Sequence, residues 1–226
     1  MSSNLERVLV RRAAVHAALG EPVRLTIVDD LVVSDRSPRE LADRLGLATN
    51  LLAHHLDVLE RVGLIERSSS AGDARRKYVR LVLDAVPGPP VAPPPPAEVL
   101  FVCTHNSARS QLAAAMWTAR TGCSARSAGT APAPRVHRGA VAAARRAGLS
   151  LADAVPTRLD RVPADVQVVT VCDLVHEELD VLPGWWHWSI PDPVERGDAA
   201  SFDAVVVELD GRIRSVAGTS DGGDVR

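Results

Sequence analysis

Eight consecutive residues have the types and spacing of a nucleophile held in an oxyanion-binding loop. They form a C-x5-R-S pattern directly after the apolar run 99–102 and comprise Cys103, Thr104, His105, Asn106, Ser107, Ala108, Arg109 and Ser110. Residues 110–117 have the helix formers and apolar spacing of an amphipathic helix, so the loop is predicted at a helix N-terminus. The unpaired N–H groups and the dipole at such an end attract a tetrahedral anion and favour a thiolate. We therefore expect Cys103 to act as a nucleophile.

The other residues of the loop have complementary roles. The planar Arg109 guanidinium suits two oxygens of one anion, and the Ser110 hydroxyl is predicted to hydrogen-bond the Cys103 sulfur. The predicted oxyanion-binding set is Thr104, His105, Asn106, Ser107, Ala108 and Arg109.

The elements that must position this loop alternate between strands and helices. Strands are predicted to end at Cys103 and Ala128 and to span 166–171, and helices are predicted over 139–147 and 202–216. This alternation predicts an α/β domain with a parallel sheet, whose carboxyl edge carries the reactive loop. Trp185, Trp186 and Trp188 are expected to pack the following loop against the sheet.

Residues 97–216 resemble the low-molecular-weight tyrosine phosphatase fold, and most of all its thiol-dependent arsenate reductase branch. The sequence 106–111 is similar to the reductase form, whereas phosphatases typically have proline at the position of Gln111. The segment 190–193 resembles the family's Asp-Pro loop, which implies that Asp192 is a general acid. Val194, Glu195 and Arg196 follow it, where the phosphatases usually have aromatic residues.

A second cysteine, Cys172, has two interpretations. The resemblance aligns it with a redox cysteine of thioredoxin-coupled reductases, which carry a further cysteine seven residues later, where this chain has Leu179. Cys172 is therefore either a redox residue or a small apolar residue at a strand end. Without the further cysteine, we expect an external thiol, mycothiol or glutathione with a glutaredoxin-like redoxin, to complete the reaction. No tightly bound cofactor is expected.

Composition favours a cytoplasmic protein of two domains. The chain has 226 residues, 46% of them hydrophobic, and a net charge of −2, with no apolar run long enough for a membrane span and no signal-peptide pattern. Its three cysteines lack the spacing of a disulfide framework. We predict a first domain over 1–84, a proline-rich linker over 85–97, a second domain over 98–216 and a disordered tail over 217–226.

The first domain is predicted to be an α+β winged helix-turn-helix. Helices are expected over 8–18, 22–33, from Pro38 to Gly46 behind a Ser37–Glu40 capping box, and over 50–62. Strands over 63–67 and 75–81 would form the wing. Residues 67–80 carry five basic residues against one acidic residue, a local charge of +4.

Residues 18–83 resemble the ArsR-type winged-helix repressors. This resemblance implies binding to operator DNA, with dimerisation through the first domain. The predicted DNA-binding residues are Asn50, Leu51, His54, Arg67, Arg75, Arg76 and Lys77. Residues 1–102 contain no cysteine, so the cysteine-based arsenic sensor of many such repressors is absent. His54 and His55 are adjacent and point in different directions on a helix, so no metal site is expected.

Together these patterns predict an arsenate reductase fused to a transcriptional regulator, acting in arsenic resistance. Phosphate would be an analogue of the arsenate substrate. Two alternatives stay open: a tyrosine phosphatase fused to a winged helix, and a non-enzymatic repressor that senses an oxyanion or arsenite.

Overall fold

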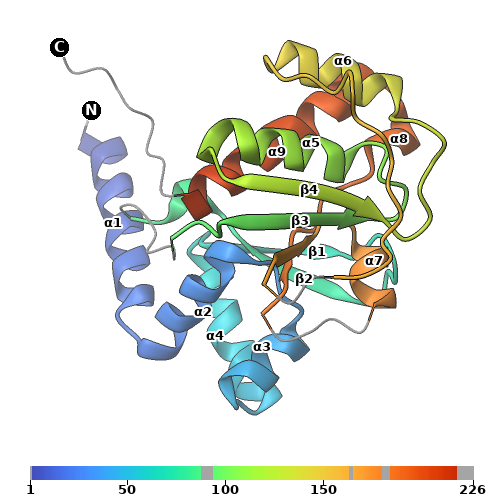
Figure 1. The fold of residues 1–226 in the computed structure, drawn as a ribbon. Helices are drawn as coiled ribbons and strands as arrows, with labels where there is room; N and C mark the ends of the chain where they lie inside the picture. The colour runs from blue at the N-terminus through green and yellow to red at the C-terminus, as the bar shows by residue number, and fades with distance from the viewer. Residues whose placement is uncertain (1, 88–93, 163–164, 180–183, 218–226) are drawn as a thin grey trace. The chain divides into compact units, whose positions relative to one another are not determined.

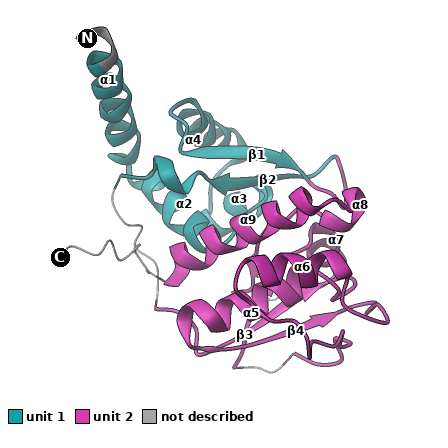
Figure 2. Cartoon of the chain, turned by 90° about the horizontal axis from the view of Figure 1, so that it is seen from above, with its two compact units in different colours: residues 1–69, 75–92 teal, residues 70–74, 93–226 magenta. Residues whose placement is uncertain are grey.

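The protein forms two compact units. A computed structural model describes residues 2–87, 94–162, 165–179 and 184–217 (Figure 1). One unit comprises residues 1–69 and 75–92, and the other comprises residues 70–74 and 93–226 (Figure 2). Much of the expected linker and tail, residues 88–93 and 218–226, lies outside the described residues.

The first unit contains helices α1 (Ser2–Leu19), α2 (Pro22–Val33), α3 (Pro38–Leu45) and α4 (Thr49–Arg61). The predicted capping box is present, because Ser37 Oγ accepts from the Glu40 N–H and the Glu40 carboxylate accepts from the Ser37 N–H. Gly46 ends α3 with φ +62°, a conformation that glycine adopts without strain. Helix α3 therefore begins and ends at the residues predicted for it, and α4 follows after a short turn.

A two-stranded antiparallel hairpin completes this unit. It pairs β1 (Ile65–Ser69) with β2 (Lys77–Leu81), and a short 3₁₀ helix (Leu83–Ala85) follows. The core beneath is apolar, and Leu52, Leu56 and Leu59 of α4 are buried in it as the periodicity predicted.

The second unit is built on a four-stranded parallel sheet in the order β4-β3-β5-β6. Its strands are β3 (Glu98–Cys103), β4 (Ser124–Gly129), β5 (Gln167–Thr170) and β6 (Trp186–His187). β3 lies at the centre, which explains its unbroken apolar run from Val99 to Val102. Cys103 is in register with Gly129, so the ends of β3 and β4 meet at one edge of the sheet.

Helices α5 (Arg109–Thr121), α6 (Arg138–Arg146) and α9 (Ala199–Ala217) gather over one face of this sheet (Figure 1). Two shorter helices, α7 (Asp173–Glu178) and α8 (Pro193–Arg196), follow β5 and β6. Trp188 is fully buried and packs against Phe101 of the central strand, with ring centroids 5.6 Å apart, in agreement with the expected packing role. The sequence patterns predicted neither the short helices nor β6, because two to six residues are too few to show a period.

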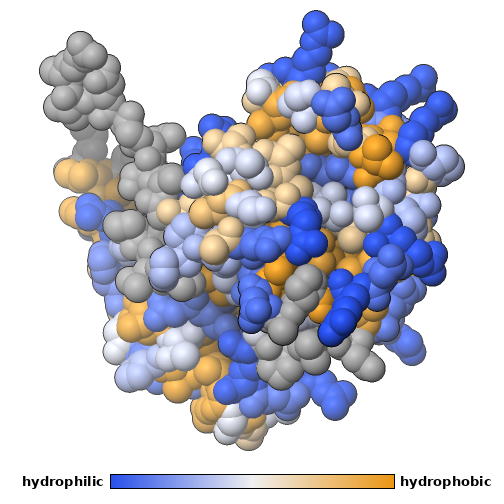
Figure 3. All heavy atoms as spheres, in the orientation of Figure 1, coloured by the Kyte–Doolittle hydropathy of each residue, from blue (hydrophilic) through white to orange (hydrophobic). Residues whose placement is uncertain are grey.

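The surface is mixed in character. On the face shown in Figure 3, hydrophilic and hydrophobic side chains are interspersed. Within the described ranges, no helix is both long enough and apolar enough to cross a membrane.

Candidate active site

The predicted reactive loop connects the end of β3 to the start of α5. Cys103 is the last residue of β3, and Arg109 is the first residue of α5. The segment after β4 donates four backbone hydrogen bonds to carbonyls of this loop: Thr130 N to Cys103 O at 3.3 Å, Ala131 N to Thr104 O at 2.9 Å, Ala133 N to His105 O at 2.9 Å and His137 N to Ser107 O at 2.8 Å. These carbonyl oxygens accept hydrogen bonds from the segment after β4. An anion would therefore bind to the N–H groups of the loop.

Two donors surround the Cys103 sulfur. Ser110 Oγ lies 3.0 Å from Cys103 Sγ, the contact predicted from the sequence, and the Asn106 N–H donates to Sγ at 3.2 Å. Cys103 is only 3% exposed. Hydrogen bonds to sulfur at a helix N-terminus stabilise a thiolate, the form that attacks an electrophile.

Asn106 holds the loop in an unusual conformation. Its φ is +47°, and no other non-glycine residue in the described part of the chain has a positive φ. Its side chain is fully buried, donates to Ser110 Oγ at 2.8 Å and accepts from the Thr157 N–H at 2.8 Å. A left-handed conformation costs energy in a residue with a Cβ, and these bonds offset that cost.

Gly129 allows β4 to approach the loop closely. A Cβ atom at this position would lie 2.6 Å from the Thr104 carbonyl oxygen and 3.0 Å from the Asn106 nitrogen. Only glycine fits this approach without moving the backbone. Gly129 thus has a packing role at the loop.

Arg109 joins the loop to the predicted general acid. Its Nη2 lies 2.6 Å from Asp192 Oδ2, and its Nη1 donates to the Ile190 carbonyl at 3.0 Å. The other carboxylate oxygen of Asp192 caps α8 by accepting from the Val194 N–H at 2.9 Å. Residues 83 positions apart in the chain are therefore brought together at the loop.

Cys172 also lies beside the loop. It is the N-cap residue of α7, is 4% exposed, and its sulfur is 3.4 Å from Thr104 Oγ1. Cys123, the third cysteine, lies just before β4 and contacts the Thr121 carbonyl instead. The structure thus brings one of the two other thiols to the loop.

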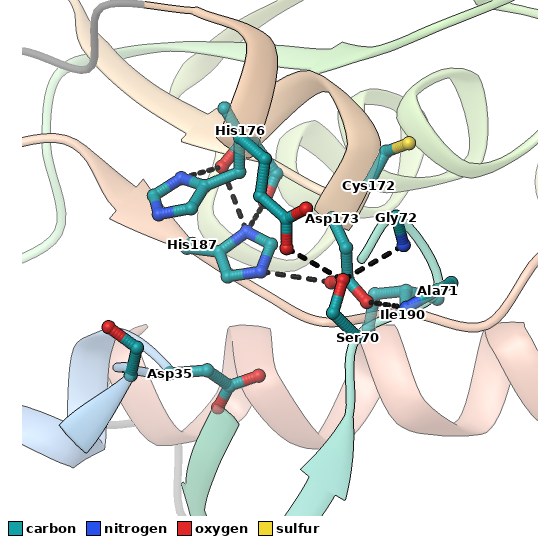
Figure 4. A network of polar contacts seen from close by, with 12 residues as sticks. Asp35, Ser70, Ala71, Gly72, Cys172, Asp173, His176, His187 and Ile190 are labelled. Carbon is teal, nitrogen blue, oxygen red and sulfur yellow. Dashed lines mark hydrogen bonds and ion pairs between the residues drawn. The ribbon is translucent and has the colours of Figure 1, made fainter. Parts of the chain in front are cut away.

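A buried polar network next to Cys172 was not predicted from the sequence (Figure 4). His187 Nε2 lies 3.0 Å from Asp173 Oδ1, and the ring of His187 stacks on that of His176 with centroids 4.0 Å apart. Thr170 Oγ1 lies 3.0 Å from Nδ1 of each histidine. Thr170 ends β5, Asp173 and His176 belong to α7, and His187 belongs to β6, so their contact depends on how three elements pack and not on one periodic segment.

The carboxylate of this network is stabilised in its charged form. Burial alone raises the pKa of Asp173, but hydrogen bonds from the His187 ring, the Ala71 N–H and Ser189 together hold that pKa below its ordinary value. Residues 70–74 belong to the same unit, and Ser70 Oγ bonds Glu177 Oε1 at 2.6 Å (Figure 4). The network therefore fixes the start of α7, where Cys172 lies.

The predicted DNA-binding residues occupy the surface of the first unit. Asn50, Leu51 and His54 lie on the exposed face of α4, and Arg75, Arg76 and Lys77 lie exposed at the start of β2. Arg67 is paired within the unit, because its Nη2 lies 2.7 Å from Asp57 Oδ1 and 3.5 Å from Glu60 Oε2. The described residues contain no group of three or more His, Cys, Asp or Glu side chains placed to hold a metal ion.

Comparisons with known proteins agree with this geometry. Residues 98–220, more than half of the chain, match the family model of the low molecular weight phosphotyrosine protein phosphatases. No curated protein matches the chain.

Solved structures similar to the chain include both reductases and phosphatases. An arsenate reductase from Archaeoglobus fulgidus is 32% identical, with 54% of this chain and 99% of that chain covered and a TM-score of 0.46. A thioredoxin-dependent arsenate reductase from Corynebacterium glutamicum is 29% identical, with 56% and 62% covered and a TM-score of 0.40. A tyrosine phosphatase from Erwinia amylovora is 20% identical, with 55% and 93% covered and a TM-score of 0.47. On the family match, the chain belongs to the low molecular weight phosphotyrosine protein phosphatase family.

Proposed function

We propose that the protein is a thiol-dependent arsenate reductase. The observation that carries the proposal is the second buried thiol at the loop, with Cys172 Sγ 3.4 Å from Thr104 Oγ1. A phosphatase needs one thiol, because water discharges its covalent intermediate. Reduction of As(V) to As(III) consumes two electrons, which two thiols supply when they form a disulfide.

The first half of the reaction uses the nucleophile, the arginine and the acid. Arsenate binds to the N–H groups of loop 103–110 and to the Arg109 guanidinium, and the Cys103 thiolate attacks arsenic. Asp192 protonates the oxygen that leaves as water. Asp192 Oδ2 lies 2.6 Å from Arg109 Nη2, so arsenate displaces this ion pair when it binds the guanidinium, and the freed carboxylate takes up the proton that it then gives to the departing oxygen.

The second half requires another thiolate. It attacks Cys103 Sγ, so an S–S bond forms while the S–As bond breaks, and its electron pair stays on arsenic, which leaves as arsenite. Two thiols are the candidates for this attack: Cys172, or an external mycothiol or glutathione supported by a glutaredoxin-like redoxin. In either case an external reductant restores the Cys103 thiol.

The phosphatase alternative uses the same residues up to the covalent intermediate. The segment after Asp192 counts against it, because Val194, Glu195 and Arg196 offer no aromatic ring to a phosphotyrosine. Gln111, in place of the proline typical of phosphatases, also favours the reductase.

A paired assay tests the proposal. Purified protein is supplied with arsenate and mycothiol or glutathione plus the matching redoxin, and arsenite is measured, with p-nitrophenyl phosphate hydrolysis followed in parallel. We expect thiol-dependent arsenite formation that Cys103→Ser abolishes. Rapid phosphate release without arsenite formation would establish the phosphatase alternative, and no turnover of either substrate would favour the oxyanion sensor.

The Cys172→Ser variant identifies the second thiol. If Cys172 attacks, this variant stops after one adduct per protein even with external thiol. If the external thiol attacks directly, the variant keeps its steady-state rate. Cys123→Ser is the matched control, because Cys123 lies just before β4 and its sulfur contacts the Thr121 carbonyl.

We infer a second role, operator binding, for the first unit. It is supported by the helix-turn-helix α3–α4 with its capping box and glycine C-cap, followed by a hairpin with exposed basic residues. Dimerisation through this unit would present two copies of α4 to one duplex. Arsenate or arsenite binding at the second unit would be the signal for release.

Fluorescence anisotropy with a labelled duplex from upstream of the gene tests this role, and light scattering tests the dimer. We expect Lys77→Ala to weaken binding more than Arg67→Ala, because among the described residues Lys77 Nζ bonds the neutral Ser69 hydroxyl, whereas Arg67 is paired with two carboxylates. Equal affinity for wild type and Lys77→Ala at several salt concentrations contradicts the role of the hairpin.

A further inference from the structure

We propose that Gln111 is a positioning residue for the reaction and that it acts on Cys103 through Asn106 and Ser110. The proposal rests on the proposed function only in taking Cys103 as the nucleophile. It concerns a side chain that touches neither the sulfur nor the anion, and it explains why an amide at this position matters to the site.

The Gln111 side chain lies behind loop 103–110. It belongs to the first turn of α5 and is 6% exposed. Its Nε2 lies 3.2 Å from the Asn106 carbonyl oxygen, 3.1 Å from Asn106 Oδ1 and 3.2 Å from the Val155 carbonyl oxygen. Two of these acceptors are backbone carbonyls, so the NH2 end of the amide must face them.

The orientation of the Asn106 amide is fixed in the same way. The Thr157 N–H donates to one end at 2.8 Å, which identifies this end as the oxygen. The other end is therefore the NH2 group, which donates to Ser110 Oγ at 2.8 Å. Since Ser110 Oγ accepts this bond, its own hydrogen is available to the Cys103 sulfur 3.0 Å away.

Every bond in this chain donates toward the sulfur. Gln111 donates to Asn106, Asn106 to Ser110, and Ser110 to Cys103. Hydrogen bonds in series polarise one another, so a donor to Asn106 Oδ1 strengthens the donation from Asn106 to Ser110 and from Ser110 to the thiolate.

Gln111 also holds the conformation on which the chain depends. Its bonds to Asn106 O and Val155 O tie the loop to residues 155–157 while Asn106 keeps its φ of +47°. An apolar residue or a proline is tolerated in the first helical turn but has no side-chain N–H to donate. The backbone of α5 is therefore compatible with either residue, and the loss is that of the Gln111 side-chain hydrogen bonds.

Alkylation of Cys103 as a function of pH tests the proposal without any substrate. Full-length protein is treated with iodoacetamide at each pH, and mass spectrometry of the Cys103 peptide gives the rate. For Gln111→Met we expect the midpoint of this profile to move up by about half a pH unit, with fewer thiolates at neutral pH. Gln111→Pro, which also lacks the amide, is expected to move it in the same direction.

Gln167→Met is the matched control. Gln167 Nε2 also donates to two backbone carbonyls, Val168 O at 3.0 Å and Gly184 O at 2.9 Å, but Gln167 lies at the start of β5 in register with Val99, four residues before Cys103. We expect it to lower thermal stability without moving the midpoint. A Gln111→Met midpoint equal to that of wild type in a folded protein, or an equal shift in Gln167→Met, overturns the proposal.

A double-mutant cycle with Ser110→Ala tests whether Gln111 acts on Cys103 through the chain of hydrogen bonds described above or through a general effect on the loop. If Gln111 acts through Ser110, Gln111→Met produces little further shift in the Ser110→Ala background. If Gln111→Met shifts the midpoint as much in the Ser110→Ala background as in the wild type, the effect does not pass through Ser110. Because alkylation needs no arsenate, a negative arsenite assay with a shifted midpoint rejects the proposed function alone.

Discussion

Replacing Gly129 by alanine should damage the site without touching a catalytic group. The new Cβ would lie 2.6 Å from the Thr104 carbonyl oxygen, and ordinary contact begins at 3.4 Å, so the loop and β4 must separate by about 0.8 Å. The atoms in the way belong to backbone or to the buried Asn106, which cannot rotate aside. Overpacking of this kind costs about 1–3 kcal/mol.

Gly129→Ala should affect the catalytic rate more strongly than the stability of the fold. A displacement of about 1 Å at reacting groups reduces a rate by up to about 100-fold, so we expect kcat to fall about 10- to 100-fold. The midpoint temperature of thermal unfolding should fall by roughly 3–10 °C. Arsenite formation and calorimetry on the same preparation measure both quantities.

Gly211→Ala is the control, and we expect it to raise stability where Gly129→Ala lowers it. Gly211 lies within α9, and a Cβ there would have no atom within 4 Å, so alanine should stabilise the helix by ~0.5–1 kcal/mol and leave the rate unchanged. A Gly129→Ala protein with wild-type kcat and stability would refute the packing argument, as would an equal rate loss in Gly211→Ala.

Three further outcomes are expected. Asp192→Asn should lower kcat by about 100- to 10,000-fold while phosphate still binds, measured by steady-state kinetics and calorimetric titration; an unchanged kcat removes Asp192 from the reaction. Arg109→Lys should weaken phosphate binding by about 10-fold or more because lysine lacks the bidentate fork, and equal affinity would contradict that role. Asp173→Asn should destabilise the second unit at pH 7, by about 1–3 kcal/mol in urea unfolding, and less at low pH. The pKa of Asp173 lies below its ordinary value of 3.8, so its carboxylate stabilises the fold above about pH 4 and this contribution disappears as the pH falls further; a difference independent of pH would contradict it.

Sequence patterns predicted helices α3 and α4 well because their signals are local. The capping box spans only Ser37 to Glu40, and Gly46 ends the helix six residues later, so each boundary depends on neighbours in the chain. The buried stripe of α4 follows the helical period for the same reason. The first helix is longer than predicted, beginning at Ser2 and not at Val8, because its first two turns lack a clear apolar face.

The local charge of +4 over residues 67–80 overstates how positive the surface of the hairpin is. Five basic residues against one acidic residue predict a phosphate-binding surface, but Arg67 pairs with Asp57 and Glu60 of α4, and Arg80 pairs with Glu66 on the opposite strand. Those carboxylates lie outside the stretch that was counted. A local sum of charge therefore overstates the potential of a hairpin whose strands pack beside acidic residues.

In the candidate site too, residues close in sequence could be predicted to meet, whereas contacts between distant segments could not. Cys103, Arg109 and Ser110 lie within eight residues, so one motif predicts their meeting, and the topology of a parallel sheet places the loop at its carboxyl edge. The atoms that complete the site come from Gly129, Thr157 and Cys172, and their approach depends on hydrogen bonds and register between segments far apart in the chain. Gln111 combines both cases, because its position is part of the motif while its partner Val155 lies 44 residues away. A motif therefore identifies the reacting groups, whereas the residues that tune them follow only from the folded contacts.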